Sequence, residues 1–222
     1  MWAPFLLDSN RHYGQTSASC SLRAVRVFLA GATGVIGRRL VPLLRAAGHD
    51  VTGMTRSVEH LSMLTDLGAT AVVCDVYDRA ALIAAVTSAR PELVMHQLTD
   101  LPDDRDLIPE YTARNARIRR EGTANLLAAA QAASATRFVA QSVAWELPGD
   151  AAAAIREFER MVLDSSGVVI RYGQFYGPGT YHAAPPAHPR IRIDDAAART
   201  IDALAGDSRI VTIAESTAAT DQ

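Results

Sequence analysis

Three glycines spaced three residues apart form the segment with the clearest chemical meaning. Gly31, Gly34 and Gly37 follow an apolar run at 25–30 and open a stretch of helical periodicity at 35–47. One glycine permits the tight turn, one lets the backbone approach a pyrophosphate, and one lets strand and helix pack closely. The phosphates would lie at the helix N-terminus, where unpaired N–H groups and the helix dipole favour an anion. We therefore expect a nucleotide site, the alternative being a turn that only packs, and its residues would be Gly31, Thr33, Gly34, Val35, Ile36 and Gly37.

Apolar runs that alternate with helical stretches must position this segment. Strands are expected near residues 25–30, 50–54, 71–74, 93–96, 137–141, 168–171 and 210–213. Helices are expected near 35–47, 58–67, 79–89, 111–133, 151–163 and 194–205, with a loop at 176–189. This alternation implies right-handed βαβ units and a parallel sheet covered on both faces. We therefore expect a doubly wound α/β fold with one domain over 24–214, a flexible extension over 1–23 and a frayed tail over 215–222.

The composition excludes several classes of function. The 222 residues carry a formal net charge of −2, which gives no cationic surface for nucleic acid or an anionic membrane. No apolar run reaches the roughly 18 residues of a membrane-spanning helix. All 22 basic residues are arginine, so a Schiff-base lysine, a Walker lysine and a Tyr-x-x-x-Lys pair are all excluded. Cys20 and Cys74 are the only cysteines, which predicts no disulfide framework, no metal site and a cytoplasmic location.

Several segments, taken in order, resemble the NAD-dependent epimerase/dehydratase group of extended short-chain dehydrogenases/reductases. The likeness covers about 25–205 and rests on 27–37, Asp75-Val76, 122–127, 137–142, Tyr176-Gly177-Pro178-Gly179 and 191–197. It implies a Rossmann-type fold with strand order 3-2-1-4-5-6-7 and a nicotinamide cofactor along the carboxyl ends of the strands. It also implies an oxidoreductase or epimerase that acts on a small carbonyl, hydroxyl or sugar-like substrate.

The resemblance suggests which residues would hold the dinucleotide. The second strand ends at Arg56, without the acidic residue that binds the ribose 2′-hydroxyl of NAD. Arg56 would pair with the 2′-phosphate of NADP, or it is a solvated arginine at a helix start. Asp75 would contact the adenine amine with Val76 beside it, or Asp75 would cap the third helix. His96 would lie beside the nicotinamide. We therefore expect NADP(H) to be preferred, with NAD(H) also able to bind.

The catalytic pair of that family is missing. Its proton-donating tyrosine and the lysine that lowers the tyrosine pKa correspond to Ala151 and Ile155 in this chain. Ser142 matches the family's active-site Ser/Thr and would position a substrate. Five other side chains could act as acids, although a structural role is favoured for each: Glu146, Tyr172, Tyr176, His96 and His182.

Two functions therefore stay open. The first is a nicotinamide-dependent oxidoreductase or epimerase, with the dinucleotide and a small molecule as its partners. Few residues follow Pro178, so the C-terminal substrate region is expected to be much reduced or borrowed from a second subunit of a homodimer. The alternative is a catalytically impaired NADP(H)-binding sensor or regulatory module.

Overall fold

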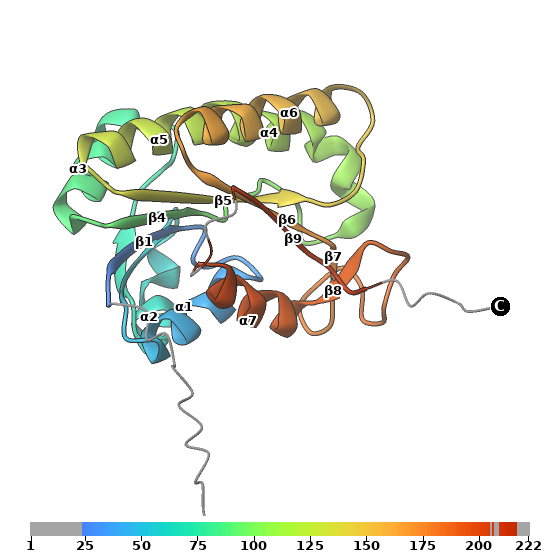
Figure 1. Ribbon diagram of the computed structural model, residues 1–222, viewed down its shortest axis with the longest axis horizontal. Helices are drawn as coiled ribbons and strands as arrows, with labels where there is room; N and C mark the ends of the chain where they lie inside the picture. The colour runs from blue at the N-terminus through green and yellow to red at the C-terminus, as the bar shows by residue number, and fades with distance from the viewer. Residues whose placement is uncertain (1–23, 205, 207–208, 217–222) are drawn as a thin grey trace, which may run out of the picture.

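The computed structural model describes residues 24–204, 206 and 209–216 (Figure 1). The predicted extension at 1–23, including Cys20, lies outside the described residues. The predicted frayed tail begins too early. Glu215 is anchored, because its backbone N–H donates to the Arg190 carbonyl at 2.8 Å and its carboxylate accepts from the Arg190 Nε at 2.9 Å. Only residues 217–222 of that tail lie outside the description.

Seven parallel strands form the central sheet in the order β3-β2-β1-β4-β5-β6-β9. The order confirms the predicted topology, with β9 as the seventh strand. It reverses between β1 and β4, and in such sheets the reversal opens a ligand crevice at the carboxyl ends of the strands. The strands are β1 (Arg26–Ala30), β2 (Asp50–Thr55), β3 (Thr70–Val73), β4 (Leu93–His96), β5 (Arg137–Val143), β6 (Val168–Tyr172) and β9 (Ile210–Ile213).

Helices cover both faces of the sheet (Figure 1). One layer contains α1 (Gly37–Ala46), α2 (Leu61–Asp66) and α7 (Ile193–Ala203). The other contains α3 (Arg79–Ala89), α4 (Thr112–Arg117), α5 (Thr123–Ala132) and α6 (Gly149–Asp164). Short 3-10 turns lie at Val58–His60 and Arg105–Tyr111. This layered arrangement is the doubly wound α/β fold that the sequence predicts.

Two hydrophobic clusters, one on each face, stabilise the sheet. Successive residues of β1 alternate between them: Val27 and Leu29 join the cluster under α1 and α7, and Phe28 and Ala30 join the cluster under α3, α5 and α6. Side chains of a strand alternate between its faces, so a strand buried on both sides is a continuous apolar run. This burial explains why the central strands are recognisable from sequence.

Two elements differ from the sequence-based expectation. The helix expected over 111–133 is divided into α4 and α5 by a π-helical turn at Ile118–Gly122. The loop expected at 176–189 is bounded by a small parallel sheet of β7 (Gln174–Tyr176) and β8 (Arg190–Arg192). A π-turn inserts one residue without changing the apolar character of a helix, and strands of three residues are too short to show alternation. Neither feature leaves a pattern in the sequence.

Among the helices that the structure describes, none combines the length and apolarity needed to cross a bilayer. Within the same residues, no three His, Cys, Asp or Glu side chains are grouped so that they could hold a metal ion.

Candidate functional site

Two of the three glycines after β1 are required by the fold itself. Gly31 has a φ of +88°, and a Cβ on it would lie 2.6 Å from the carbonyl oxygen of Gln97. A Cβ on Gly37 would lie 2.1 Å from the carbonyl oxygen of Gly31. Side chains at these two positions would collide with backbone, so their glycines are explained without any ligand.

Gly34 is different, because a Cβ there would meet the protein in one tight contact and not in a collision. Its φ is outside the left-handed region, it is exposed, and the nearest atom to an added Cβ would be the Gly31 carbonyl oxygen at 3.3 Å. The helix behind it, α1, has Ile36 at its N-cap position with no side-chain cap and no acidic residue in its first turn. A helix N-terminus without a side-chain cap, next to exposed loop backbone, favours an anion, which fits the pyrophosphate of a dinucleotide.

A cavity of about 120 Å³ adjoins this loop at the carboxyl ends of β1, β2 and β4. It brings together five of the predicted cofactor residues, namely Gly31, Thr33, Gly34, Arg56 and Val76. Its remaining walls come from Met54, Thr55, Gln97, Leu98, Thr99 and Ile118. The other predicted residues, Val35, Ile36, Gly37, Asp75 and His96, do not line it.

Arg56 is the charged side chain in the lining of this cavity. It is exposed, and it forms no hydrogen bond or ion pair with any part of the chain that the structure describes. The cavity lining contains no carboxylate to compete for the guanidinium. The site therefore presents a free planar cation, which suits a phosphate better than a ribose hydroxyl.

Asp75 does not cap the third helix. The N-cap of α3 is Asp78, whose carboxylate accepts the Ala81 N–H at 3.0 Å. Asp75 is exposed just after β3, and its carboxylate accepts the Tyr77 N–H at 2.9 Å. The capping alternative is thus wrong, since the cap lies three residues later. No described group donates to the second carboxylate oxygen of Asp75, which is therefore available to accept a hydrogen bond from an adenine amine.

His96 lies in the core instead of the crevice, which corrects the expectation that it contacts the nicotinamide. The side chain has 0% exposure, its Nδ1 accepts the Leu98 N–H at 3.2 Å, and its Nε2 donates to the Thr123 hydroxyl at 2.9 Å. Burial, together with the nearby Arg119, lowers the His96 pKa to about 3. The imidazole is therefore neutral. The next residue, Gln97, lines the cavity in its place.

Ser142 has a protein partner for its hydroxyl. Its Oγ donates to Glu159 Oε1 at 2.6 Å, and Arg171 binds the same carboxylate through Nε at 2.9 Å and Nη2 at 2.5 Å. Burial raises the Glu159 pKa, but the bonds from Arg171 and Ser142 outweigh burial and hold the pKa below its usual range. The charged Glu159 accepts a hydrogen bond from the Ser142 hydroxyl, so this hydroxyl is engaged within the protein and does not donate to a substrate. This triad of Ser142, Glu159 and Arg171 is not predicted from the sequence.

A second, larger cavity of about 510 Å³ lies beside this triad, between α6 and the ends of β5 and β6. Apolar side chains from the loop and the helix form much of its wall, including Trp145, Leu147 and Ile155. Arg156 and Glu146 add charge at its edge, and Glu159 and Arg171 line its inner side. Ile155 lines this space, which is large enough for a small organic substrate.

The other candidate acids have structural partners. Tyr172 is buried, its hydroxyl forms a 2.6 Å hydrogen bond with the Thr200 hydroxyl, and burial raises its pKa. The Tyr176 hydroxyl donates to Glu215 at 2.5 Å. His182 lies in the loop after β7, where burial and Arg105 lower its pKa. Glu146 is the one candidate that lines the large cavity.

The glycine loop, the cavity behind it and the switch in strand order define a dinucleotide-binding protein of the doubly wound class. Residues 31–164 match the NAD(P)H-binding protein family, and the chain belongs to that family. The NAD(P)-binding family that the sequence indicates is thereby confirmed.

Two relatives carry names of enzymes. The 3-diazoavenalumate denitrifying reductase of a Streptomyces species is 45% identical over 183 residues, which are 72% of this chain and 59% of the reductase. A 3-beta-hydroxysteroid dehydrogenase of Mycolicibacterium neoaurum is 32% identical over 114 residues, 51% of this chain and 31% of that enzyme. The chain thus spans less than two thirds of the length of either relative.

Solved structures share the fold at low identity. The UDP-glucose 4-epimerase of Thermus thermophilus in complex with NAD has a TM-score of 0.73 at 19% identity, covering 86% of this chain and 78% of the epimerase. A short-chain dehydrogenase of Burkholderia cenocepacia in complex with NADP has a TM-score of 0.71 at 18% identity, covering 86% and 89%. The expected Rossmann-type fold is confirmed by these similarities.

Proposed function

We propose that the chain is an NADPH-dependent reductase whose substrate accepts a hydride without receiving a proton from the protein. One observation carries this proposal: the position of the family's proton-donating tyrosine carries no acid. Ala151 and Ile155 stand where the family has tyrosine and lysine, and the Ser142 hydroxyl is already donated to Glu159 at 2.6 Å. A carbonyl reduction would need an acid at this place. A substrate of another kind would not.

The proposed cofactor residues divide into two groups by position. Gly31, Thr33 and Gly34 are proposed to cradle the pyrophosphate with their backbone, and Arg56, which lines the same cavity, is proposed to bind the 2′-phosphate of NADP. Asp75 and Val76 at the end of β3 are proposed to contact the adenine. Bound NADPH would supply the hydride. The preference for NADPH over NADH is supported by the free guanidinium of Arg56 and by the lack of a carboxylate in the cavity lining.

The substrate class follows from chemistry and from the reductase relative, which is named for removing nitrogen from a diazo compound. For a diazonium group the balanced change is R–N₂⁺ + H⁻ → R–H + N₂, because the C–N bond breaks and dinitrogen leaves with no protonation. The protein would then only need to bind and orient the substrate. Trp145, Leu147 and Ile155 offer an apolar wall for its organic part, and Arg156 offers a cation to a carboxylate on it.

Purified protein, NADPH and a panel of aryl diazonium salts with matched aldehydes test the proposal. We expect NADPH oxidation and dinitrogen release in a one-to-one ratio with at least one diazonium salt, above an enzyme-free control. Deuterium from labelled NADPH should appear at the carbon that carried nitrogen. Aldehyde reduction should be slower by at least about 10²-fold, since a general acid typically contributes about 10²- to 10⁴-fold. Aldehyde turnover at about 10 s⁻¹, an ordinary kcat, would contradict the proposal.

The missing proton donor also supports a second candidate, an NADP(H)-binding sensor without turnover. The sensor and the reductase predict different results in one measurement, the oxidation of NADPH. A sensor would bind NADPH in calorimetry and oxidise it with no member of either panel. The reductase would do both.

The compartment and assembly are proposals as well. A cytoplasmic location is supported by the buried free thiol of Cys74, which suits a reducing compartment. A homodimer, in which a second copy would complete the substrate site, is tested by light scattering of the purified protein with and without NADPH.

A further inference from the structure

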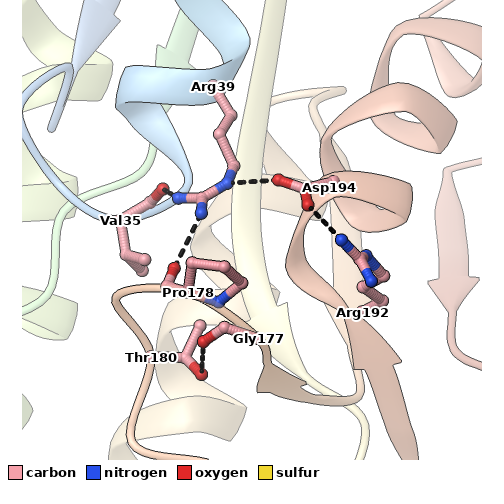
Figure 2. Close-up of polar contacts among 7 residues, drawn as sticks. All are labelled: Val35, Arg39, Gly177, Pro178, Thr180, Arg192 and Asp194. Atoms are coloured by element: carbon pink, nitrogen blue, oxygen red, sulfur yellow. Dashed lines mark hydrogen bonds and ion pairs between the residues drawn. The ribbon is translucent and has the colours of Figure 1, made fainter. Parts of the chain in front are cut away.

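The side chain of Arg39 in the first turn of α1 connects three separate segments. Figure 2 shows its guanidinium between the glycine loop, the loop after β7 and the start of α7. It donates to the Val35 carbonyl, to the Pro178 carbonyl and to Asp194 Oδ1, each at 2.7 Å. Its side chain is 22% exposed. Three short bonds at different segments require the planar fork of arginine, which a lysine cannot supply.

The bond to Val35 fixes one peptide of the phosphate cradle. In a trans peptide the C=O and the following N–H point in opposite directions. Because the Val35 carbonyl points at Arg39, the Ile36 N–H must point away from Arg39. Ile36 is the N-cap of α1, and no described side chain caps this helix end. Arg39 thus holds a helix-terminal N–H in a fixed direction.

The carboxylate of Asp194 offsets the electrostatic cost of the Arg39 cation in the first turn of α1. A positive side chain in the first turn of a helix is disfavoured by the helix dipole. The hydrogen bond from Arg39 lowers the Asp194 pKa, and Arg192 reaches the other carboxylate oxygen at 3.2 Å. The paired carboxylate stays charged and offsets the cation.

The bond to Pro178 holds a compact loop, residues 177–182, which we term the strap. Its ends meet where the Gly177 N–H donates to the His182 carbonyl at 2.8 Å. Gly179 has a φ of +77°, and a Cβ on it would lie 3.9 Å from Val35 Cγ2. At its other side the Tyr181 hydroxyl donates to the Pro102 carbonyl, in the loop that follows β4. The strap therefore bridges the two loops on either side of the crevice.

We infer that Arg39 is a positioning residue for dinucleotide binding, which aligns the Val35–Ile36 peptide and holds the strap against the phosphate loop. The inference rests on the dinucleotide site of the proposed function, and it is independent of the substrate. Bound dinucleotide should in turn restrain the strap, because the strap and the cradle share the same guanidinium.

Arg39→Met is the test, with Arg45→Met as its matched control. Arg45 lies on the same helix and also donates to one carbonyl, that of His49 at 2.9 Å, and one carboxylate, that of Asp50 at 2.7 Å, away from the loop. We expect calorimetry to show NADPH bound at least about tenfold more weakly by Arg39→Met, and with wild-type affinity by Arg45→Met. Hydrogen exchange at 177–182 should slow on NADPH addition in the wild type and in Arg45→Met only.

A purely structural role would lower the melting temperature of both variants and leave the affinity of folded Arg39→Met unchanged, which would overturn the inference. Arg39→Lys covers the case in which Arg39→Met does not fold. It keeps the charge and loses the fork, so it should also bind NADPH more weakly, and wild-type affinity in this variant would equally overturn the inference. A wild-type protein that binds no NADPH would overturn the dinucleotide site itself.

Discussion

At the scale of single residues, the three glycines of the phosphate loop are required for different reasons. Side chains at Gly31 and Gly37 would collide with the carbonyls of Gln97 and Gly31 at 2.6 and 2.1 Å. A Cβ on Gly34 would make one tight contact, with the Gly31 carbonyl oxygen at 3.3 Å, which a small shift relieves. The fold explains two glycines, and a ligand that approaches the backbone explains the third.

Gly34→Val should therefore abolish dinucleotide binding while the protein stays folded. The valine would occupy the space of the pyrophosphate, and its Cβ would need only a shift of a few tenths of an ångström from the Gly31 carbonyl oxygen at 3.3 Å. We expect calorimetry to show no binding of NADPH and the melting temperature without ligand to change by only a few degrees. Gly37→Val is the contrast, because its side chain would collide with the loop backbone and should prevent folding. Undiminished affinity in folded Gly34→Val would mean that the loop does not hold the phosphates.

For single residues, the sequence predicts correctly where the backbone requires glycine. It does not predict in which direction a side chain points. Glycine spacing and the missing acid before Arg56 are visible as residue types, and Arg56 does line the cavity. The direction of a strand residue depends on which face is buried. His96 belongs to the same face as Phe28 and contacts Phe158, and so Gln97 takes the place in the cavity. The triad of Ser142, Glu159 and Arg171 joins three successive elements, β5, α6 and β6, through side-chain contacts that no local pattern indicates.

At the scale of elements, the sequence predicts the bounds of some helices and strands correctly. It misses short strands that depend on tertiary pairing. The helix expected at 79–89 and the strands expected at 93–96 and 210–213 match α3, β4 and β9. In contrast, β7 and β8 exist only because they pair with each other, and the strap between them is defined by bonds to Arg39 and Pro102. Local propensity carries no information on such contacts.

His96 of β4 is hydrogen-bonded to Thr123 of α5. Its burial predicts a dependence of stability on pH. The imidazole has a folded pKa of about 3, below the usual unfolded value of about 6.5. Below pH 6.5 the unfolded chain therefore binds a proton that the folded chain does not. Unfolding becomes easier as the pH falls, by about 1.4 kcal/mol per unit, so His96 costs about 2 kcal/mol between pH 7 and pH 5.

Urea unfolding of wild type and His96→Gln at the two pH values measures this contribution. Glutamine keeps a polar group near the Thr123 hydroxyl and cannot titrate. Its unfolding free energy should decline less on acidification than that of the wild type, by about 2 kcal/mol. If the two proteins lose stability in parallel, His96 is able to take up a proton in the folded state.

At the scale of the whole molecule, residues that the two helical layers position lie close to the carboxyl ends of the strands. α1 with the glycine loop comes from one layer and α6 with Glu159 from the other, and the sheet between them carries Arg56 and Gln97 at its edge. A dinucleotide at this edge would contact loops after β1, β2 and β4 at once. Its binding should then be visible as stability of the entire fold, because a ligand that binds only the folded state stabilises it.

NADPH should accordingly raise the melting temperature more than NADH does at the same concentration. One charge-assisted bond from Arg56 to the 2′-phosphate is worth roughly 1.5 to 3 kcal/mol, or about a ten- to hundredfold preference. Ligand at about 100 times Kd adds roughly 2.7 kcal/mol, and at about 2 to 4 °C per kcal/mol the shift is near 5 to 10 °C. Thermal unfolding of the wild type with each nucleotide measures the difference.

Arg56→Ala should remove most of that difference by reducing the NADPH shift to the level of NADH. Arg160→Ala is the control, because this exposed arginine of α6 lies outside both cavity linings and should leave the two shifts unchanged. Equal shifts in the wild type, or a preference that survives in Arg56→Ala, would show that Arg56 is a solvated residue after β2. The preference for NADPH would then need a contact from another part of the loop, and the free guanidinium in the cavity lining would have no part in selecting the cofactor.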